Sequence, residues 1–214
     1  FYRLSQLGFI QIRPQRATVV TPISEEAIRQ AFFIRLALEI ACIREAARKL
    51  TPAHHNALQG LIARQQAAIA ADDRGGFHAL DDQFHHDIFA YSGLEFVWTL
   101  VKDNKGHMDR ARWLSLSYNA RNAMEEHKVI LSALRERDEN KAVAAIGLHL
   151  SRINDTLDRL RADLADKSEQ LAALTARWEA EKSGLNRVGD LKARLDDLRT
   201  KADRMQREGD YENA

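Results

Sequence analysis

The sequence predicts an all-α protein: an antiparallel helical bundle of six to seven helices, with a short N-terminal β-hairpin and a C-terminal coiled-coil extension. The 214 residues include only three Pro and ten Gly, the residue types that most disfavour helix interiors. Apolar residues recur through most of the chain at the spacing of one helix face. Short polar turns separate the predicted helices, which favours antiparallel neighbours.

Charge and cysteine content narrow the class of protein further. Lys and Arg number 32 and Asp and Glu number 31, so net charge gives no case for a nucleic-acid or membrane surface overall. No apolar run is long enough to span a bilayer, and we expect no membrane association. The single Cys42 excludes an internal disulfide framework and fits a reducing cytoplasm. Because it lies in the apolar run LALEIACI, we expect it to be buried and inert.

Residues 1–22 read as the end of a helix followed by a β-hairpin. FYRLSQLG is predicted to stop at Gly8, and the runs FIQI and ATVV flank the turn RPQR. The hairpin is either a plain surface element or the wing of a winged helix-turn-helix, whose tip residues Arg13 and Arg16 would contact DNA. Since the rest of such a module is not in this sequence, we expect negligible specific DNA binding by residues 1–214.

The main body, residues 23–160, is predicted to be a series of helices. The first spans Glu25–Leu50 with Ser24 as N-cap, and Thr51 followed by Pro52 begins the second, which runs to Ala71. Asp72–Gly76 is a predicted break. The later helices are expected at Phe77–Ser92, Leu94–Ser115, Asn119–Arg137 and from about Lys141 onward.

The run FHALDDQFHHDIFAYS places Asp81 four residues before His85, so the two side chains share one helix face. That pair alone is also typical of hydrogen-bonded surface residues. His127 and His149 each border apolar runs, where a single histidine is more often a satisfied core residue than a ligand. Together, however, an Asp and three His from three helices would suit a divalent transition metal with positions left for water or a carboxylate.

Other charged and imidazole side chains have ordinary explanations. Arg35 lies among apolar residues, and an arginine there more often snorkels or forms a salt bridge than binds a ligand. The remaining histidines are expected to face solvent or to form hydrogen bonds; they are His54, His55, His78, His86 and His107.

The segment 161–214 has apolar residues at heptad spacing, which indicates a coiled coil. The alternation is interrupted at Ser183–Asp190. We therefore expect two helices forming a coiled-coil hairpin or one kinked long helix, with Asp190 able to cap the second part. The simplest interpretation of the mixed charges is a solvated helical arm.

The body resembles the effector-binding FCD domain of GntR-type transcription regulators in the FadR subfamily. The resemblance is carried by FIRLALEIACIREAA, FHALDDQFHHDIFAYSG, EEHKVILSALRERD and AIGLHLSRI. It implies a metal held by Asp81, His85, His127 and His149. The opening FYRLSQLGFIQIRPQRATVVTP resembles the junction of recognition helix and wing in the same family, with Arg13 and Arg16 at the wing tip.

The resemblance also implies a function. In this family the domain senses small organic acids, and the ion, which could be zinc, nickel, iron or manganese, helps to hold the effector carboxylate. Arg35 is the first candidate for a guanidinium that binds the acid, with Arg112 second and Arg110 third. A homodimer is expected, and operator DNA is the partner of the intact protein. The chain is not expected to be an enzyme.

Two alternatives stay open. One is a metal-dependent enzyme using the same ligands, although only Asp82 or Glu126 could serve as its general base. The other is an interaction scaffold in which the tail carries the function and the bundle is passive.

About the last 50 residues resemble part of the middle-domain coiled coil of the disaggregase ClpB. The matching runs are LTARWEAEKSGLNRVGDLKARLDDLRTKAD and REGDYENA. No GxxxxGK[ST] motif is present, so disaggregase activity is excluded for this chain. We expect a fusion, engineered or natural, whose boundary falls near Asp155–Leu164.

Overall fold

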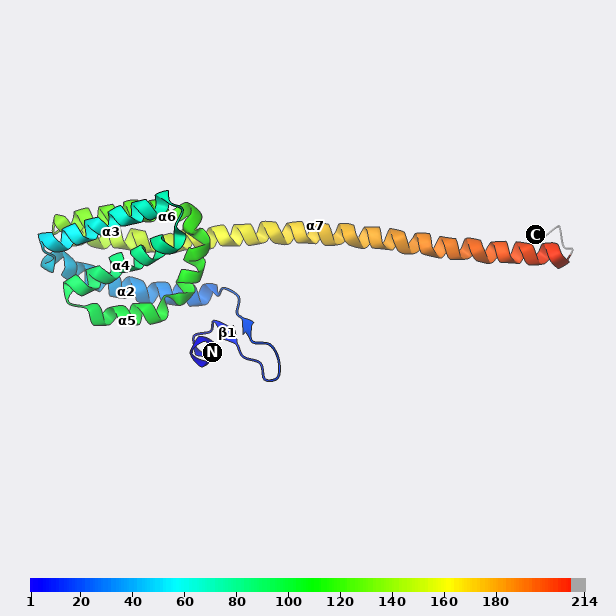
Figure 1. The fold of residues 1–214 in the computed structure, drawn as a ribbon, viewed down its shortest axis with the longest axis horizontal. Coiled ribbons are helices and arrows are strands. Elements are labelled where there is room, and N and C mark those ends of the chain that lie inside the picture. The colour runs from blue at the N-terminus through cyan, green and yellow to red at the C-terminus, as the bar shows by residue number, and fades with distance from the viewer. Residues whose placement is uncertain (209–214) are drawn as a thin grey trace. The chain divides into compact units, whose positions relative to one another are not determined.

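The computed structural model describes residues 1–208, and it confirms the predicted all-α class with a small β-hairpin (Figure 1). The chain divides into two compact units, Phe1–Arg159 and Leu160–Ala214. Within residues 1–208, no helix combines the length and apolar character needed to cross a membrane.

The N-terminal segment forms the predicted helix end and hairpin. Helix α1 spans Tyr2–Gln6 and is closed by Gly8, whose φ of 75° places it in the left-handed region that favours glycine. Strand β1 (Ile10–Gln11) pairs antiparallel with β2 (Val19–Val20). The predicted tip residues, Arg13 and Arg16, are both exposed in the connecting loop.

Helices α2 and α3 begin at the predicted caps. Helix α2 spans Glu25–Lys49, and the Ser24 hydroxyl accepts a hydrogen bond from the Ala27 amide at 3.2 Å. Helix α3 spans Pro52–Ala70, where Thr51 and His54 cap each other through side chain and backbone. The imidazole of His54 therefore completes a helix start, as a hydrogen-bonding residue.

Helix α4 spans Arg74–Ser92, slightly longer at its start than predicted, because Asp73 caps it by accepting from the Gly76 amide at 2.8 Å. It ends at Gly93, which has a φ of 83°. Helix α4 packs against α2, α3 and α5, so it is the central element of the bundle and a suitable place for a buried site.

The predicted boundary between the next two helices is wrong. Helix α5 spans Glu95–Asn104 and α6 spans Gly106–Arg135, so the break lies at Lys105 and the expected gap after Ser115 is helical. Ser115 only returns a hydrogen bond to the Arg112 carbonyl at 2.9 Å, which a helix accommodates. Next to the break, residue 106 must be a glycine, because the Phe9 ring occupies the space that a Cβ would need, at 2.6 Å.

The hairpin is attached to the first turns of α6. Arg110 donates to the Thr21 carbonyl at 2.6 Å, and His107 Nε2 donates to the Leu7 carbonyl at 2.8 Å. The His107 ring also stacks on Phe9 with centroids 4.4 Å apart. These contacts fix the N-terminal segment against the bundle.

Helix α7 spans Glu139–Glu208, and its first part closes the bundle. The core is formed by fully buried apolar side chains from several helices, each contributing about 2 kcal/mol through removal from water. They include Ile43, Leu58, Ile62, Phe84, Phe89, Ile130, Leu134 and Ile146.

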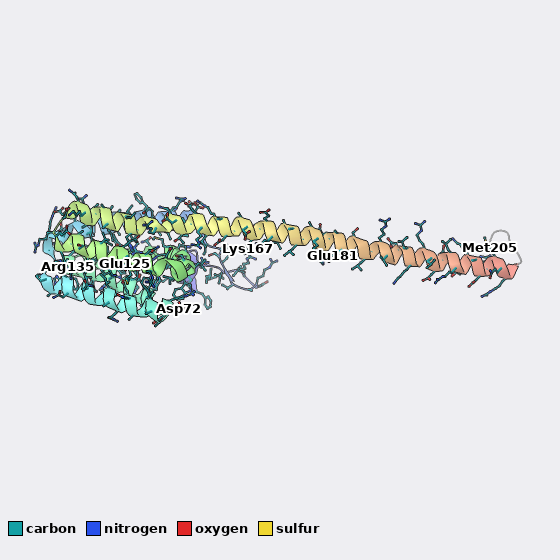
Figure 2. All side chains as sticks on the ribbon, turned by 90° about the horizontal axis from the view of Figure 1, so that it is seen from above. Asp72, Glu125, Arg135, Lys167, Glu181 and Met205 are labelled. Atoms are coloured by element: carbon teal, nitrogen blue, oxygen red, sulfur yellow. The ribbon has the colours of Figure 1, made fainter. Side chains whose placement is uncertain are left out.

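In the second unit α7 continues as one long helix through Ser183–Asp190, so of the two expected forms the coiled-coil hairpin, with its helix break, is wrong and the long helix is present (Figure 2). Gly184 and Gly189 lie inside the helix, where each costs only about 1 kcal/mol relative to Ala. Apolar side chains along the unit are largely exposed, among them Leu164, Leu171, Leu174, Trp178, Leu185, Val188, Leu191, Leu195 and Leu198. The last part of the ClpB-like match, residues 209–214, lies outside the described residues.

Candidate metal centre

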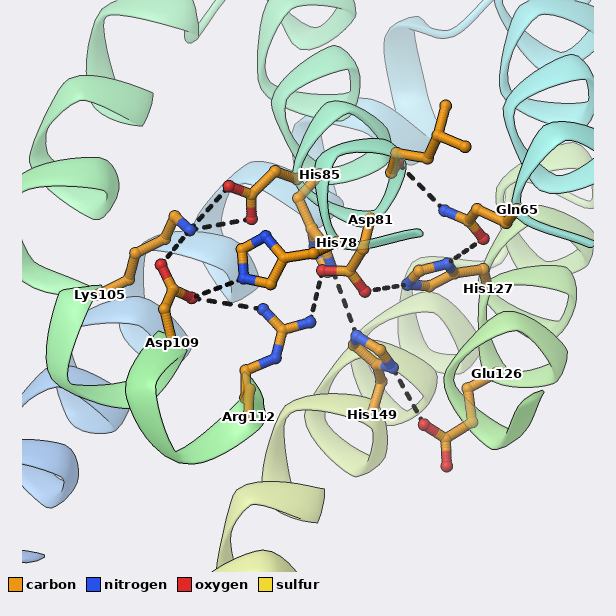
Figure 3. A network of polar contacts seen from close by, with 12 residues as sticks. Gln65, His78, Asp81, His85, Lys105, Asp109, Arg112, Glu126, His127 and His149 are labelled. Atoms are coloured by element: carbon orange, nitrogen blue, oxygen red, sulfur yellow. Dashed lines mark hydrogen bonds and ion pairs between the residues drawn. The ribbon is translucent and has the colours of Figure 1, made fainter. Parts of the chain in front are cut away.

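The structure brings together the four predicted metal ligands. Asp81 and His85 come from α4, His127 from α6 and His149 from α7 (Figure 3). Each offers one donor atom, and the four atoms lie within 4.8 Å of one another. Asp81, His85 and His127 have no exposed surface, and His149 is 7% exposed. A compact, buried set of one carboxylate and three imidazoles is therefore present in the bundle interior.

The imidazoles turn the same ring nitrogen toward the centre. His85 Nε2 lies 3.2 Å from His149 Nε2, and His127 Nε2 lies 3.6 Å from Asp81 Oδ1. Each opposite nitrogen, Nδ1, bonds to an acceptor outside the group. The pairs are His85 with Glu39 Oε2 at 2.7 Å, His127 with Gln65 Oε1 at 2.9 Å, and His149 with Glu126 Oε2 at 3.0 Å.

These outer acceptors fix the tautomer of each ring. A carboxylate or amide oxygen requires a proton on Nδ1, and a neutral imidazole then has its lone pair on Nε2, facing the centre. Three such lone pairs and a carboxylate oxygen are the donors that a divalent metal ion needs.

The two carboxylate acceptors are held in turn by arginines. Arg35 Nε donates to Glu39 Oε1 at 2.5 Å, and Arg152 Nε donates to Glu126 Oε1 at 2.7 Å. Burial acts to raise the pKa of Glu39, but Arg35 and His85 outweigh it and lower the pKa to about 2. Glu39 is thus a carboxylate at any pH near neutral.

Sequence reasoning missed Glu39 and Gln65. A signal existed for each: Glu39 follows Arg35 by one helical turn, and Gln65 falls on the same face of α3 as Leu58 and Leu61. A glutamine on an apolar face needs a buried partner, and here it finds two, His127 and the Leu80 carbonyl, to which its nitrogen donates at 3.1 Å.

The protonation states suit a metal. Burial, followed by the neighbouring His149, holds the pKa of His127 well below its usual value. Burial also lowers the pKa of His149, although its bond to Glu126 acts in the opposite direction. For Asp81 burial acts to raise the pKa, but Arg112 and the three imidazoles together keep it well below its usual range.

Two of the atoms that would bind a metal lack a hydrogen bond among the described residues. Asp81 Oδ1 and His127 Nε2 are buried and form no hydrogen bond with any described residue. Buried polar groups are rarely left unsatisfied, because each costs about 1–3 kcal/mol. A cation between them would satisfy both, so the residues present fit a metal ion.

A cavity of about 160 Å³ adjoins the centre. Arg35, Arg112 and His149 lie on its wall together with neutral polar residues, including Ser115, Asn119, Asn122 and Thr156. Arg35 is 2% exposed, and its Nη2 has no hydrogen-bond partner among the described residues. Arg112 Nη2 donates to Asp81 Oδ2 at 2.5 Å.

The third arginine candidate lies elsewhere. Arg110 does not line this cavity; it donates to the backbone carbonyls of Thr21 and Pro22. Its guanidinium fixes the hairpin, so we leave Arg110 out of the acid-binding set.

A second acidic group lies beside the centre. His78, Asp82 and Asp109 have donor atoms within 4.8 Å of one another, yet Lys105 Nζ reaches into the group and bonds both carboxylates, at 2.7 Å for Asp82 Oδ2 (Figure 3). The ammonium group already supplies a cation there. His78 Nε2 lies 3.7 Å from Asp109 Oδ1, an ion-pair distance.

The predictions for Cys42 and for three further histidines have different outcomes. Cys42 is buried as expected, and burial raises the pKa of its thiol to about 12. His86 and His107 form hydrogen bonds. The expectation for His55 is wrong, because it is buried with its Nε2 unbonded among the described residues.

A helical bundle with convergent imidazoles beside a cavity that arginines help to line is the architecture of a ligand-binding domain. The FCD-domain family model matches residues 30–152, and the chain belongs to this family. Over 168 residues the chain is 32% identical to the HTH-type transcriptional repressor RspR of Escherichia coli K12, covering 78% of this chain and 74% of the repressor. It is therefore an effector-binding regulatory domain of the GntR family of transcription regulators.

Solved structures share the fold. The E. coli protein McbR/YncC matches with a TM-score of 0.65 at 19% identity, over 74% of this chain and 81% of its own. The metal-free FCD domain of TM0439 matches with a TM-score of 0.55 at 20% identity, over 66% of this chain and 99% of its own.

The tail has a separate similarity. It is 59% identical over 58 residues to the chaperone ClpB of Propionibacterium freudenreichii, a match that covers 27% of this chain and 7% of the chaperone. The similarity is limited to a short piece of ClpB.

Proposed function

We propose that this chain is a metal- and acid-sensing domain of the FadR type. Asp81, His85, His127 and His149 bind one divalent transition metal: zinc, nickel, iron or manganese, which imidazole and carboxylate ligands all suit. A small carboxylic acid then occupies the adjoining cavity and alters how the intact protein engages operator DNA.

The observation that carries the proposal is the shared orientation of the three imidazoles. Three separate helices supply acceptors to Nδ1, and every Nε2 consequently faces Asp81. A structural cluster of histidines has no need for that arrangement, and it leaves two buried atoms unbonded. A bound metal accounts for both features. When bound, it would supply a Lewis-acidic position for a carboxylate oxygen.

The cavity supports the acid. Its volume of about 160 Å³ is below that of drug-sized sites, typically about 300 Å³ or more, so the effector is small. Arg35 lines this cavity and has a buried Nη2 without a hydrogen bond among the described residues, and Arg112 lines it with a second guanidinium. Guanidinium groups bind carboxylates through paired hydrogen bonds.

The DNA-binding part of the proposal rests on the family and the hairpin. Arg13 and Arg16 are exposed at a hairpin tip, where a wing would contact phosphates in the intact protein. We propose that the intact regulator is a homodimer, since paired modules match paired half-sites.

Metal analysis tests the proposal. We expect about one transition metal per purified chain. His85→Ala should abolish it, whereas the matched change at the next residue, His86→Ala, should leave it intact because His86 points away toward Asp87 and Trp98. Equal metal content in both variants contradicts the site.

Calorimetry with metal-loaded protein tests the acid. Arg112→Lys keeps the charge but loses the planar fork, and should weaken binding of a small acid such as malate or citrate about tenfold or more. Arg110→Lys is the matched control and should bind as the parent does. Unchanged affinity in Arg112→Lys contradicts the assigned cavity.

A further inference from the structure

From Val188 onward the apolar residues of the tail helix follow a heptad register of their own. Counting from there, Val188, Leu195 and Ala202 occupy heptad position a, and Leu191, Leu198 and Met205 occupy d. Four of these side chains are about half or more exposed: Val188 at 49%, Leu191 at 55%, Leu195 at 48% and Leu198 at 62%. Within residues 1–208 no helix covers this apolar stripe, whereas coiled-coil residues at these positions normally pack against a partner helix.

Charge is segregated around this stripe. The flanking e and g positions between 187 and 206 carry cations and no acid; they are Arg187, Lys192, Arg194, Arg199 and Lys201, with Gln206 neutral. The acids occupy the outer b and c positions; they are Asp190, Asp196, Asp197 and Asp203. Such e and g positions determine which helices can pair.

We propose that residues 187–206 are a docking surface for an amphipathic helix whose own apolar stripe is flanked by Asp and Glu. Acidic flanks on the partner would pair with the cations while the two stripes bury each other. The intrahelical bonds do not prevent this. Lys201 bonds Asp197 at 2.8 Å, but both side chains are more than 60% exposed, and such surface pairs are worth at most about 1 kcal/mol.

A second copy of the same segment fits poorly. In a parallel pair, position g of one helix faces e of the next heptad on the other, which opposes Arg194 to Arg199. An antiparallel pair opposes g to g and e to e, which are again cations. Self-pairing therefore places like charges together in either direction.

A membrane surface is also disfavoured. Helices that lie in a bilayer interface need a broad apolar face, whereas a stripe limited to a and d is the narrow seam of a coiled coil. The four aspartates at the outer positions, moreover, lie only a helix width away from an anionic headgroup layer, and the like charges would repel each other.

Fluorescence anisotropy with the full chain tests the proposal. The probes are two labelled peptides about four heptads long, both with Leu at a and d, one with Glu and the other with Lys at e and g. We expect the Glu peptide to bind at least about 100-fold more tightly, and its affinity to fall with salt. The triple variant Arg194→Glu, Arg199→Glu, Lys201→Glu should reverse the preference.

A matched variant with outer-face charge changes, Arg204→Glu with Arg207→Glu, should leave the preference unchanged. Circular dichroism verifies that each variant stays helical. Equal binding of both peptides, binding to phosphatidylserine vesicles in preference to the Glu peptide, or self-association that Leu195→Asn with Leu198→Asn abolishes would each overturn the proposal.

Discussion

The side-chain amide of Gln65 is oriented by two hydrogen bonds, one of which it forms with His127. Its nitrogen donates to the Leu80 carbonyl at 3.1 Å, so only its oxygen is left to accept from His127 Nδ1, at 2.9 Å. The amide therefore selects one tautomer of His127 without carrying charge.

Replacing this amide should weaken the metal site. Gln65→Leu removes the acceptor for Nδ1 and frees the ring to turn, so we expect metal affinity to fall about 10–100-fold. Competition with a chelator measures it. The neighbouring Gln66 is exposed, and Gln66→Leu is the control that should change nothing. Equal affinities would show that Gln65 has only a packing role.

Asp109 should stabilise the fold in a pH-dependent way. Burial acts to raise its pKa, but His78, Lys105 and Arg112 hold it below its ordinary value of 3.8. A group whose pKa is lowered by folding stabilises the protein above its unfolded value, and this contribution is lost as pH falls toward the folded value. Asp109→Asn should cost about 2 kcal/mol at pH 7.

The difference between parent and Asp109→Asn should shrink below pH 4, because the unfolded state then takes up a proton at Asp109 while the folded state still holds it ionised. Urea unfolding at pH 7 and pH 3 measures both values. Asp72 is 85% exposed, and Asp72→Asn is the control for loss of a charge alone. A penalty that is the same at both pH values would refute the ion-pair account.

Cys42 should resist modification in the folded protein. With a pKa of about 12, roughly one thiol in ten thousand is ionised at pH 8, and the group is also buried. A chromogenic disulfide reagent should react only after denaturant is added. Ala41 is exposed, so Ala41→Cys in a Cys42→Ala background should react readily when native. Fast reaction of native Cys42 would contradict its burial.

Two glycines should respond oppositely to alanine. At Gly106 a Cβ meets the Phe9 ring at 2.6 Å, so Gly106→Ala should loosen the hairpin and speed hydrogen exchange at the Thr21 amide, which donates to the Phe9 carbonyl at 3.0 Å. At Gly147 nothing lies within 4 Å, and Gly147→Ala should stabilise α7 by about 0.5–1 kcal/mol. Unchanged exchange in Gly106→Ala would show that the hairpin rests elsewhere.

Local rules predicted helix starts and ends well because they depend on neighbours in the chain. Ser24 and Thr51 cap helix starts and Gly93 caps a helix end, each through contacts with residues at most a few positions away. The break at Lys105 was missed because no proline or capping side chain marks it, and the close approach of Phe9 to Gly106 joins residues nearly a hundred positions apart in sequence. The tail break was over-predicted, since glycines in a helix lower its stability without ending it.

The four candidate metal ligands were inferred from a motif resemblance, and the structure brings their side chains together. Their outer acceptors were not predicted, because Glu39, Gln65 and Glu126 become partners only when α2, α3 and α6 pack around α4 and α7. Arg110 could not be separated from Arg112 by sequence, although two positions along a helix turn their side chains in different directions.

Because of the outer acceptors, the geometry of this small centre depends on the packing of the whole bundle. Ligands from α4, α6 and α7 are oriented by side chains on α2, α3 and α6, so five helices must be assembled before the donors converge. An ion bound here would be a cross-link that exists only in the folded state. At a free concentration about 1,000 times its dissociation constant it would add about 4 kcal/mol to the unfolding free energy of the whole bundle.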